Sequence, residues 1–378
     1  MNSFNRGEWS EFYGVLFLLV KPKIQLVDGN LNPLNQVIYI VKKVILDSKI
    51  KLEYVVDDSG DIFIYADSDY ILSYTNEEID FERQRLLNSI MSHKAKERAF
   101  TLPVLEDFID DMTQGVSFKS KSNNKSDVVT LSLDMLKGTD VELSYSIKSS
   151  LGSPATILNA SSNTNFKYKI ENFPKDQIKT VNSIDTSTKL LDRIHKIQSY
   201  PNTKIIFDSV ASKEFEHNLK MVDSLLPNYL GKALLYSYEF DNKDLKHIFA
   251  LANPELDPSL ANKKLGDFLN GVSFGFVPGT IWDGKNSVNG GLIVVKRNGD
   301  VVVLDLMYYP QEVAKYIINE SKLDSPSTHR YHMLELFEEN GEVYFTLNLQ
   351  VRYKAWSAWY CAFNLAFFSN EYACFSFY

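Results

Sequence analysis

The sequence has few cysteines and no long hydrophobic run. Its 378 residues include two cysteines, Cys361 and Cys374, both among the last eighteen. So few thiols exclude a disulfide framework and a cysteine-ligated zinc site. The apolar run at residues 12–20 is much shorter than the roughly 20 apolar residues that a transmembrane helix needs. Acidic residues precede this run and no small-residue cleavage site follows it, so we expect no secretory signal, no membrane partner and a cytoplasmic location.

An excess of basic residues is also missing. The chain carries 40 Lys and Arg against 48 Asp and Glu, a formal charge of −8. As an average, this charge argues mildly against a polyanionic partner such as DNA. The composition, 44% hydrophobic and 23% charged, is typical of a globular protein. Its length suits two or three domains or one large α/β domain.

The acidic average conceals a basic segment. Residues 117–204 hold 13 Lys and Arg against eight Asp and Glu, a local charge of +5, so the rest of the chain carries −13. Residues 83–98 add five more basic side chains. Phosphate groups are bound by basic side chains at this density. We therefore expect a basic DNA-binding face on an acidic body, with a solvated charged surface as the alternative.

Hydrophobic periodicity predicts an alternation of helices and strands. Helices are expected over 7–20, 33–47, 76–98, 102–114, 186–199 and 211–227, and strands over 52–56, 62–65, 128–133, 141–148, 166–170 and 204–207. Two Asn-Gly turns predict hairpins over 291–307 and 334–351. The mixture indicates an α/β or α+β fold. We expect a helical part at 1–115, a catalytic core at about 116–230 and a β-rich, DNA-contacting part at about 265–353.

The last 25 residues differ in composition from the rest. Residues 354–378 contain ten aromatic side chains, one Lys and one Glu. They could form a buried terminal element, a flap that contacts a partner, or an appendage that the rest of the chain does not need. No function is assigned to them.

The central hairpin holds the one arrangement that suggests catalysis. Asp127 begins its first strand, and Ser146 and Lys148 end its second. Phosphodiester hydrolysis uses a divalent cation to polarise the phosphate and a lysine to hold the attacking water. Mg²⁺ prefers oxygen ligands and needs only one or two carboxylates. A turn centred on Lys137-Gly138 would place Asp127 opposite Lys148 and leave Asp134 at the turn, about 20 Å away.

This register conflicts with the hydrophobic pattern of the two strands. It places Val129, Leu131 and Leu133 across from Glu142, Ser144 and Ser146. A β-bulge in either strand would remove the conflict, and bulges are frequent beside active sites. We therefore predict a bulge between Asp127 and Leu133 or between Val141 and Lys148. On its own, such a hairpin also fits a purely structural role.

Four segments outside and around this hairpin resemble the HpaII family of type II restriction endonucleases. They are Gly7–Tyr13, Ser144–Ala160, Thr164–Phe166 and Leu347–Arg352. The resemblance extends from residue 5 to residue 353. It implies a PD-(D/E)xK nuclease core, a mixed sheet flanked by helices with additional C-terminal hairpins, that uses Mg²⁺ to cut double-stranded DNA at CCGG.

The resemblance also implies roles for individual residues. Asp127 would bind the metal, and Lys148 would be the lysine of the xK half-motif. Ser126 replaces the usual proline, and Ser146 stands where a second acidic residue is usual. A carboxylate from elsewhere would then complete the metal site. Glu11, on the N-terminal helix, is the first choice, and Glu8 and Glu171 are the alternatives.

Several polar residues are candidates for DNA contacts. Lys119, Lys121 and Lys125 precede the first hairpin strand, and Asn163 and Asn165 follow the second. The alternative role for the two asparagines is to cap a turn. Arginine, lysine and amide side chains read G·C pairs in the grooves, and the candidates for this role are His329, Arg330, Gln350 and Arg352.

Together these features predict a Mg²⁺-dependent, sequence-specific deoxyribonuclease that works beside a protective DNA methyltransferase, as a monomer or homodimer. The alternatives are a structure-selective nuclease of the same fold, a catalytically silent DNA-binding module, and an interaction protein that uses its aromatic tail.

Overall fold

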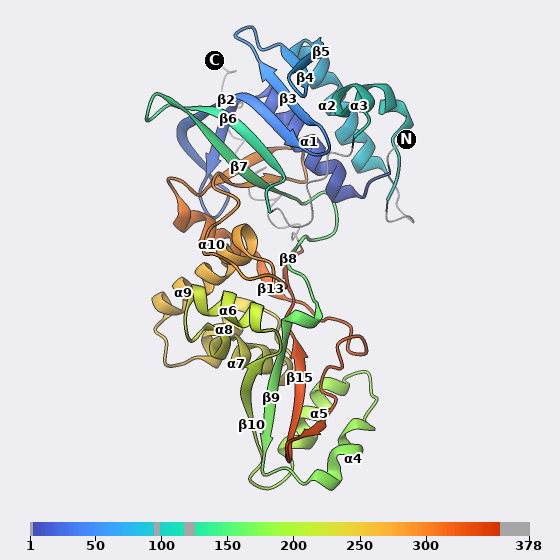
Figure 1. Ribbon diagram of the computed structural model, residues 1–378, viewed down its shortest axis with the longest axis vertical. Coiled ribbons are helices and arrows are strands. Elements are labelled where there is room, and N and C mark those ends of the chain that lie inside the picture. Colours follow the sequence, from blue (N-terminus) through green and yellow to red (C-terminus); the bar gives the residue numbers. More distant parts are fainter. Residues whose placement is uncertain (1–2, 94–98, 117–124, 356–378) are drawn as a thin grey trace, which may run out of the picture.

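The computed structural model describes residues 3–93, 99–116 and 125–355. In this part of the chain, a nine-stranded sheet occupies one end of an elongated molecule and a four-stranded sheet occupies the other (Figure 1). A three-stranded sheet, β13-β16-β8, lies between them. The expected mixture of helices and strands is confirmed, and the strands are divided among three sheets.

The nine-stranded sheet has the order β1-β12-β11-β7-β6-β2-β3-β4-β5. It is mixed, because β7 pairs with β11 in parallel and with β6 in antiparallel orientation. Its strands are β1 (Lys23–Val27), β2 (Pro33–Asp47), β3 (Lys51–Val56), β4 (Ile62–Ala66), β5 (Asp69–Tyr74), β6 (Val128–Asp134), β7 (Thr139–Ser149), β11 (Gly291–Val295) and β12 (Val301–Asp305). The helices near it are α1 (Arg6–Val20), α2 (Asn76–Ser92) and α3 (Glu106–Thr113), with a 3-10 turn, Pro103–Leu105.

Helix α1 packs against β7 and β11. Asn5 and Glu8 form a capping box that satisfies the N–H groups at its start. A Cβ added to Gly14 would lie 3.4 Å from the side chain of Ile147 and 3.7 Å from that of Val295. The absence of a side chain at Gly14 therefore lets the helix approach the two strands closely.

The four-stranded sheet, β10-β9-β15-β14, belongs to the second part of the molecule. The strands of this part are β8 (Thr156–Leu158), β9 (Asn165–Glu171), β10 (Lys204–Val210), β13 (Ser321–Leu323), β14 (Phe337–Glu339), β15 (Glu342–Asn348) and β16 (Val351–Tyr353). The helices are α4 (Ile178–Asn182), α5 (Lys189–Gln198), α6 (Lys213–Val222), α7 (Leu226–Glu239), α8 (Leu245–Ala252), α9 (Pro258–Asn270) and α10 (Pro310–Glu320). Short 3-10 turns at Ser162–Thr164 and Lys175–Gln177 and a π-helical turn at Gly271–Gly275 complete it.

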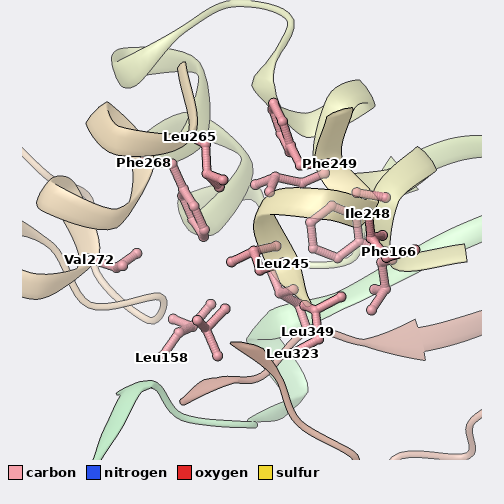
Figure 2. Close-up of a cluster of buried hydrophobic side chains, with 14 of the residues drawn as sticks. Leu158, Phe166, Leu245, Ile248, Phe249, Leu265, Phe268, Val272, Leu323 and Leu349 are labelled. Atoms are coloured by element: carbon pink, nitrogen blue, oxygen red, sulfur yellow. The ribbon is translucent and has the colours of Figure 1, made fainter. Parts of the chain in front are cut away.

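A hydrophobic core joins the short strands to the helices of this second part. Leu158 of β8 and Leu323 of β13 pack near Leu349, Phe166 and the side chains of α8 and α9 (Figure 2). The same cluster contains Leu292 and Val294 of β11. The alternate residues of β11, Ile293 and Val295, belong to the core around α1. Strand β11 is thus buried on both faces, and the two cores meet across it.

Most of the elements expected from periodicity are confirmed, and the helix predicted over 33–47 is wrong. This segment is the long strand β2, which pairs with β1, β3 and β6. Register shifts interrupt its pairing with β1 and, between Val41 and Lys43, its pairing with β6. The buried positions accordingly change from Tyr39 and Val41 to Val44 and Leu46. This change of phase hides the two-residue period of a strand and imitates helical spacing.

The predicted hairpin is confirmed and its predicted register is wrong, and no bulge interrupts the paired residues 128–134 and 139–145. Val128 pairs with Tyr145, and the pairing continues without a shift to Asp134 and Thr139. The turn is closed by the Gly138 N–H, which donates to Asp134 O at 2.8 Å, and Gly138 has φ 66°. The turn therefore lies one residue earlier than expected. Asp127 precedes the first pair, and its N–H donates to Tyr145 O, three residues before Lys148.

The remaining expectations concern single strands and helices. The strand expected over 166–170 is confirmed as β9, which lies in the four-stranded sheet. Residues 3–93 and 99–116, expected to be helical, contain α1, α2 and α3 and also β1–β5. None of the helices among the described residues is long and apolar enough to cross a membrane. Residues 356–378, which make up nearly all of the aromatic tail, lie outside the described residues.

Candidate active site

Asp127 is fixed by the backbone of strand β7. Its own N–H donates to Tyr145 O at 2.8 Å. The Ile147 N–H donates to Asp127 Oδ2 at 2.7 Å, in the place where a backbone carbonyl would continue the ladder. The carboxylate thus ends the pairing of β6 with β7, and its position depends directly on β7.

Ser146 and Lys148 complete a chain of contacts with this carboxylate. Lys148 Nζ donates to Ser146 Oγ at 2.7 Å and to Ile147 O at 3.2 Å. Ser146 Oγ donates to Asp127 Oδ2 at 3.1 Å. Lys148 Nζ itself lies 3.8 Å from Asp127 Oδ2. The structure therefore brings together the three side chains that the sequence singled out.

These side chains lie on the face of the sheet opposite α1. Ser146 is paired with Leu292 and Lys148 with Val294, and both β11 residues belong to the second core. The side chains of Lys148 and Asp127 are 25% and 17% exposed, whereas Ser146 as a whole is 2% exposed. A ligand can therefore reach the charged groups at the junction of the two cores, while the serine is covered.

Lys125 also lies in the electrostatic field of this site. Burial and, to a smaller extent, the positive charge of Lys148 lower the pKa of its ammonium group to about 8, although Asp127 partly opposes the shift. The sequence suggested Lys125 only as a DNA contact. The structure places Lys125 near Lys148 and Asp127, so the site contains two lysines and one carboxylate.

Helix α1 brings Glu11 toward the end of β7. Gly14 packs against Ile147, and a Cβ on Gly152, just beyond β7, would lie 3.2 Å from Arg6 Cβ and 3.7 Å from Gly7 N. At about 100° per residue, Glu11 lies within roughly 60° of the helix face that Gly7 and Gly14 define. Helix α1 and the Asp127 side chain lie on opposite faces of the sheet. The side chains of Glu11 and Asp127 can therefore approach each other only past the N-terminal start of β6.

The two alternative carboxylates occupy less suitable positions. Glu8 Oε2 accepts the Asn5 N–H at 2.8 Å as part of the capping box, and Glu8 is about 100° from Gly7 on the helix. Glu171 ends β9 in the four-stranded sheet, where it pairs with Lys204. Among the three candidates, Glu11 is the one on the helix face that Gly7 and Gly14 turn toward the sheet.

The donor set fits a hard cation with few protein ligands. Among the described residues, no group of three or more His, Cys, Asp and Glu side chains could hold a metal ion. Mg²⁺ is commonly bound by one or two carboxylates, with water and phosphate oxygens as the other ligands. The Asp127 carboxylate and the Ile147 carbonyl oxygen, which share the Lys148–Ser146 cluster, are oxygen donors of the required kind.

The sequence did not predict the hydrogen bonds that Asn289 makes with strand β7. Asn289 Oδ1 accepts the N–H of Ser144 at 2.7 Å and its hydroxyl at 3.0 Å, and Asn289 Nδ2 donates to Glu142 O at 3.1 Å. Ser144 Oγ also contacts Ser287 O at 3.1 Å. Ser144 and Asn289 are 145 positions apart along the chain, so no local pattern could have revealed the contact.

The structure separates the expected DNA contacts. Asn165 Oδ1 accepts from the buried Asn348, and Arg352 Nε pairs with Asp324 Oδ2 at 3.0 Å. Arg330 and His329 are exposed, and Gln350 is half-buried. A Cβ on Gly279 would lie 3.0 Å from Asn163 Nδ2. Lys119 and Lys121 lie outside the described residues.

The basic segment does not form one continuous basic face in the described part of the chain. Lys167, Lys169 and Lys175 form ion pairs with acids of the β14–β15 hairpin, Glu339, Glu342 and Glu338 respectively. Arg193 is buried and donates to backbone carbonyl groups. Arg83, on α2, is also buried and contacts Asp80 and Tyr13. Much of the local positive charge is therefore compensated.

A family model described as HpaII restriction endonuclease matches residues 5–353. The chain belongs to this family. It is similar to the type II restriction enzyme HpaII of Haemophilus parainfluenzae, with 31% identity over 365 residues that cover 93% of this chain and 98% of that enzyme. No solved structure matches the chain.

Membership confirms the resemblance inferred from the sequence. A chain of the HpaII family is a restriction endonuclease, that is, a DNA-binding nuclease and hydrolase of a restriction-modification system. The family match covers the Asp127–Lys148 hairpin, α1 and both outer sheets, and it stops short of the aromatic tail.

Proposed function

We propose that this protein is a Mg²⁺-dependent type II restriction endonuclease that cuts double-stranded DNA within CCGG. The observation that carries the chemistry is the contact chain from Lys148 through Ser146 to Asp127. The similarity to the HpaII enzyme over 93% of the chain supports the substrate, and the choice of CCGG depends on family resemblance alone.

The nine-stranded sheet has the features expected of a PD-(D/E)xK core. Asp127 directly precedes β6, Lys148 is near the end of the neighbouring strand β7, and α1 packs across the sheet. Ser126 and Ser146 replace two residues of the consensus. Because the first of these positions supplies no chemistry, only the serine at 146 changes the ligand set.

Asp127 and Glu11 would hold the metal ion, with the Ile147 carbonyl as a further oxygen donor. A bound divalent cation polarises the scissile phosphate and lowers the pKa of a bound water. The protein fixes Asp127 through the Ile147 N–H. Helix α1 would bring the Glu11 carboxylate to the metal beyond the start of β6.

Lys148 would hold the attacking water and offset the negative charge of the phosphate. Two of its three N–H donors bond to Ser146 and Ile147, which leaves one for water or a phosphate oxygen. Lys125, near both Asp127 and Lys148, adds a second positive charge on the path of the DNA backbone. Charged donors fixed before the reaction stabilise developing charge at little reorganisation cost.

The remaining DNA contacts are proposed for Lys119, Lys121, Asn163, Asn165, Arg330, Gln350 and Arg352. Of these, Arg330 is exposed and free to reach a groove. Arg352 would first have to leave Asp324. The enzyme would act as a monomer or homodimer, in the cytoplasm, beside a methyltransferase that protects the same sites.

The proposal is tested by digesting a sequenced plasmid, with and without Mg²⁺, and mapping the ends. We expect discrete fragments with 5′-phosphate ends at CCGG, only with the metal. Lys148→Ala should abolish cleavage and leave DNA binding nearly intact. A Lys148→Ala variant that cuts at the wild-type rate would refute the site. Fragments without a common sequence would indicate a structure-selective nuclease, and binding without cleavage a silent module.

A further inference from the structure

We propose that Ser146 is a positioning residue that holds the Lys148 ammonium group in its reactive place. This inference rests on the proposed function, because it assigns Lys148 to the cleavage step. It concerns the position where the family's wider motif has an acidic residue, and it gives the serine a role of its own.

The Ser146 hydroxyl occupies the centre of the site. It accepts from Lys148 Nζ at 2.7 Å and donates to Asp127 Oδ2 at 3.1 Å. Lys148 Nζ has no such direct bond to the carboxylate, which lies 3.8 Å away. The serine therefore links the two charged groups and sets the distance between them.

Because Ser146 is buried, water cannot easily replace its hydroxyl group between Lys148 and Asp127. Ser146 is 2% exposed, whereas the Lys148 side chain is 25% exposed. Water can reach the ammonium group from outside, but it has little access to the hydroxyl. Because a lysine side chain has several rotatable bonds, loss of the buried acceptor would free Nζ to move toward solvent.

A serine acts differently here from an acidic residue. A carboxylate at this position would carry a negative charge and could bind the metal directly. The hydroxyl is neutral, accepts from the lysine and donates to Asp127 at the same time. It leaves the Asp127 carboxylate as the compensating charge for Lys148 and Lys125, so the serine holds the ammonium without adding a second negative charge.

The alternative is that Ser146 only satisfies the end of the β6–β7 ladder. Ser144 provides a matched control, because it lies two residues earlier on the same face of β7. Its hydroxyl bonds to Ser287 and Asn289 and not to the charged groups. Removing it tests the effect of losing another hydroxyl of β7 without disturbing Lys148.

The test compares Ser146→Ala, Ser146→Thr and Ser144→Ala in the full-length enzyme. For each variant, kcat and KM for plasmid cleavage, metal-free DNA affinity and thermal unfolding are measured. We expect Ser146→Ala to lower kcat about 10- to 100-fold, as displacement of a reacting group does. KM, DNA affinity and melting temperature should stay near the wild-type values. Ser146→Thr, which keeps the hydroxyl, should recover most of kcat, and Ser144→Ala should retain it.

Three results would overturn the inference. They are a wild-type kcat for Ser146→Ala, an equal loss for Ser144→Ala, and a folded Ser146→Thr that is no more active than Ser146→Ala. A wild-type kcat for Lys148→Ala would instead refute the proposed function itself. An inactive Lys148→Ala beside a fully active Ser146→Ala would refute only the role of the serine.

Discussion

The Asp127 carboxylate accepts the backbone N–H of Ile147 at 2.7 Å, so a side chain replaces a ladder bond at the end of strand β6. The same carboxylate is the proposed metal ligand. Its position is therefore determined by the strand that carries Lys148, and any movement of β7 would displace both groups together.

This double role predicts different outcomes for two substitutions at Asp127. In Asp127→Asn, the amide oxygen can still accept the Ile147 N–H, but the charge is lost. We expect cleavage to be abolished with a nearly unchanged melting temperature. Asp127→Ala leaves the Ile147 N–H without its partner and should also lower stability by about 1–3 kcal/mol. Cleavage assays and denaturant unfolding check both. Substantial cleavage by Asp127→Asn would contradict the metal-ligand assignment.

The position of Glu11 on α1 predicts that it and Glu8 can be distinguished. Glu11→Gln should raise the Mg²⁺ concentration needed for cleavage and lower the maximal rate, because a proposed ligand loses its charge. Glu8→Gln should affect mainly helix α1, through the capping box with Asn5, at a cost of about 0.5–2 kcal/mol. Cleavage titrated with Mg²⁺ and thermal unfolding separate the two effects. The opposite pattern would make Glu8 the ligand.

The sequence predicted the hairpin and its charged residues, because local alternation and a turn suffice for both. It placed Asp127 opposite Lys148, whereas in the structure Asp127 precedes the Val128–Tyr145 pair and its N–H donates to Tyr145 O. The difference arises because Asp134 Oδ1 accepts the N–H groups of Leu136 and Lys137, which shifts the turn. The sequence alone does not show whether these hydrogen bonds of the Asp134 side chain or the turn preference of Lys137-Gly138 decides the position of the turn.

The remaining differences have long-range causes. Strand β11 is inserted beside β7 from a segment about 145 residues later, and Asn289 follows from that insertion. Strand β9 follows the hairpin in the sequence but pairs with β15 in the four-stranded sheet. Local patterns contain no information on these pairings, since both strands would be equally apolar on their buried faces in either sheet.

Two buried carboxylates at the other end of the sheet predict opposite pH effects on stability. Burial raises the pKa of Asp134, but the Tyr308 hydroxyl and backbone N–H groups outweigh it, so the pKa lies below the ordinary value of 3.8. For Asp305, burial dominates over the hydrogen bonds from Tyr308 and Tyr39, so the pKa lies above 3.8. Asp134 therefore stabilises the fold above pH 3.8, and this contribution is lost as the pH falls through its lowered pKa.

Asp305 acts in the opposite direction. Its folded state binds more protons than the unfolded chain between pH 3.8 and the raised pKa, so stability decreases as the pH rises through this window. Unfolding free energies of Asp134→Asn and Asp305→Asn, each compared with the wild type across pH, check both signs. The Asp134 variant should become relatively less stable with rising pH, and the Asp305 variant relatively more stable. Equal trends for the two would contradict the assignment.

The ion pair of Arg352 with Asp324 predicts that not every proposed DNA contact contributes equally. Lys125 and Arg330 have no ion-pair partner among the described residues, whereas Arg352 Nε lies 3.0 Å from Asp324 Oδ2. A lysine or arginine that binds a phosphate contributes about 0.9 to the slope of log affinity against log salt. We expect Lys125→Gln to reduce the slope by about that amount and Arg352→Gln to change it little.

Arg330→Gln should reduce the slope if it binds phosphate, or relax the preference for CCGG if it reads a base. Binding of CCGG and unrelated duplexes in Ca²⁺, over a series of salt concentrations, distinguishes these outcomes. A large change for Arg352→Gln would show that the pair with Asp324 opens when DNA binds.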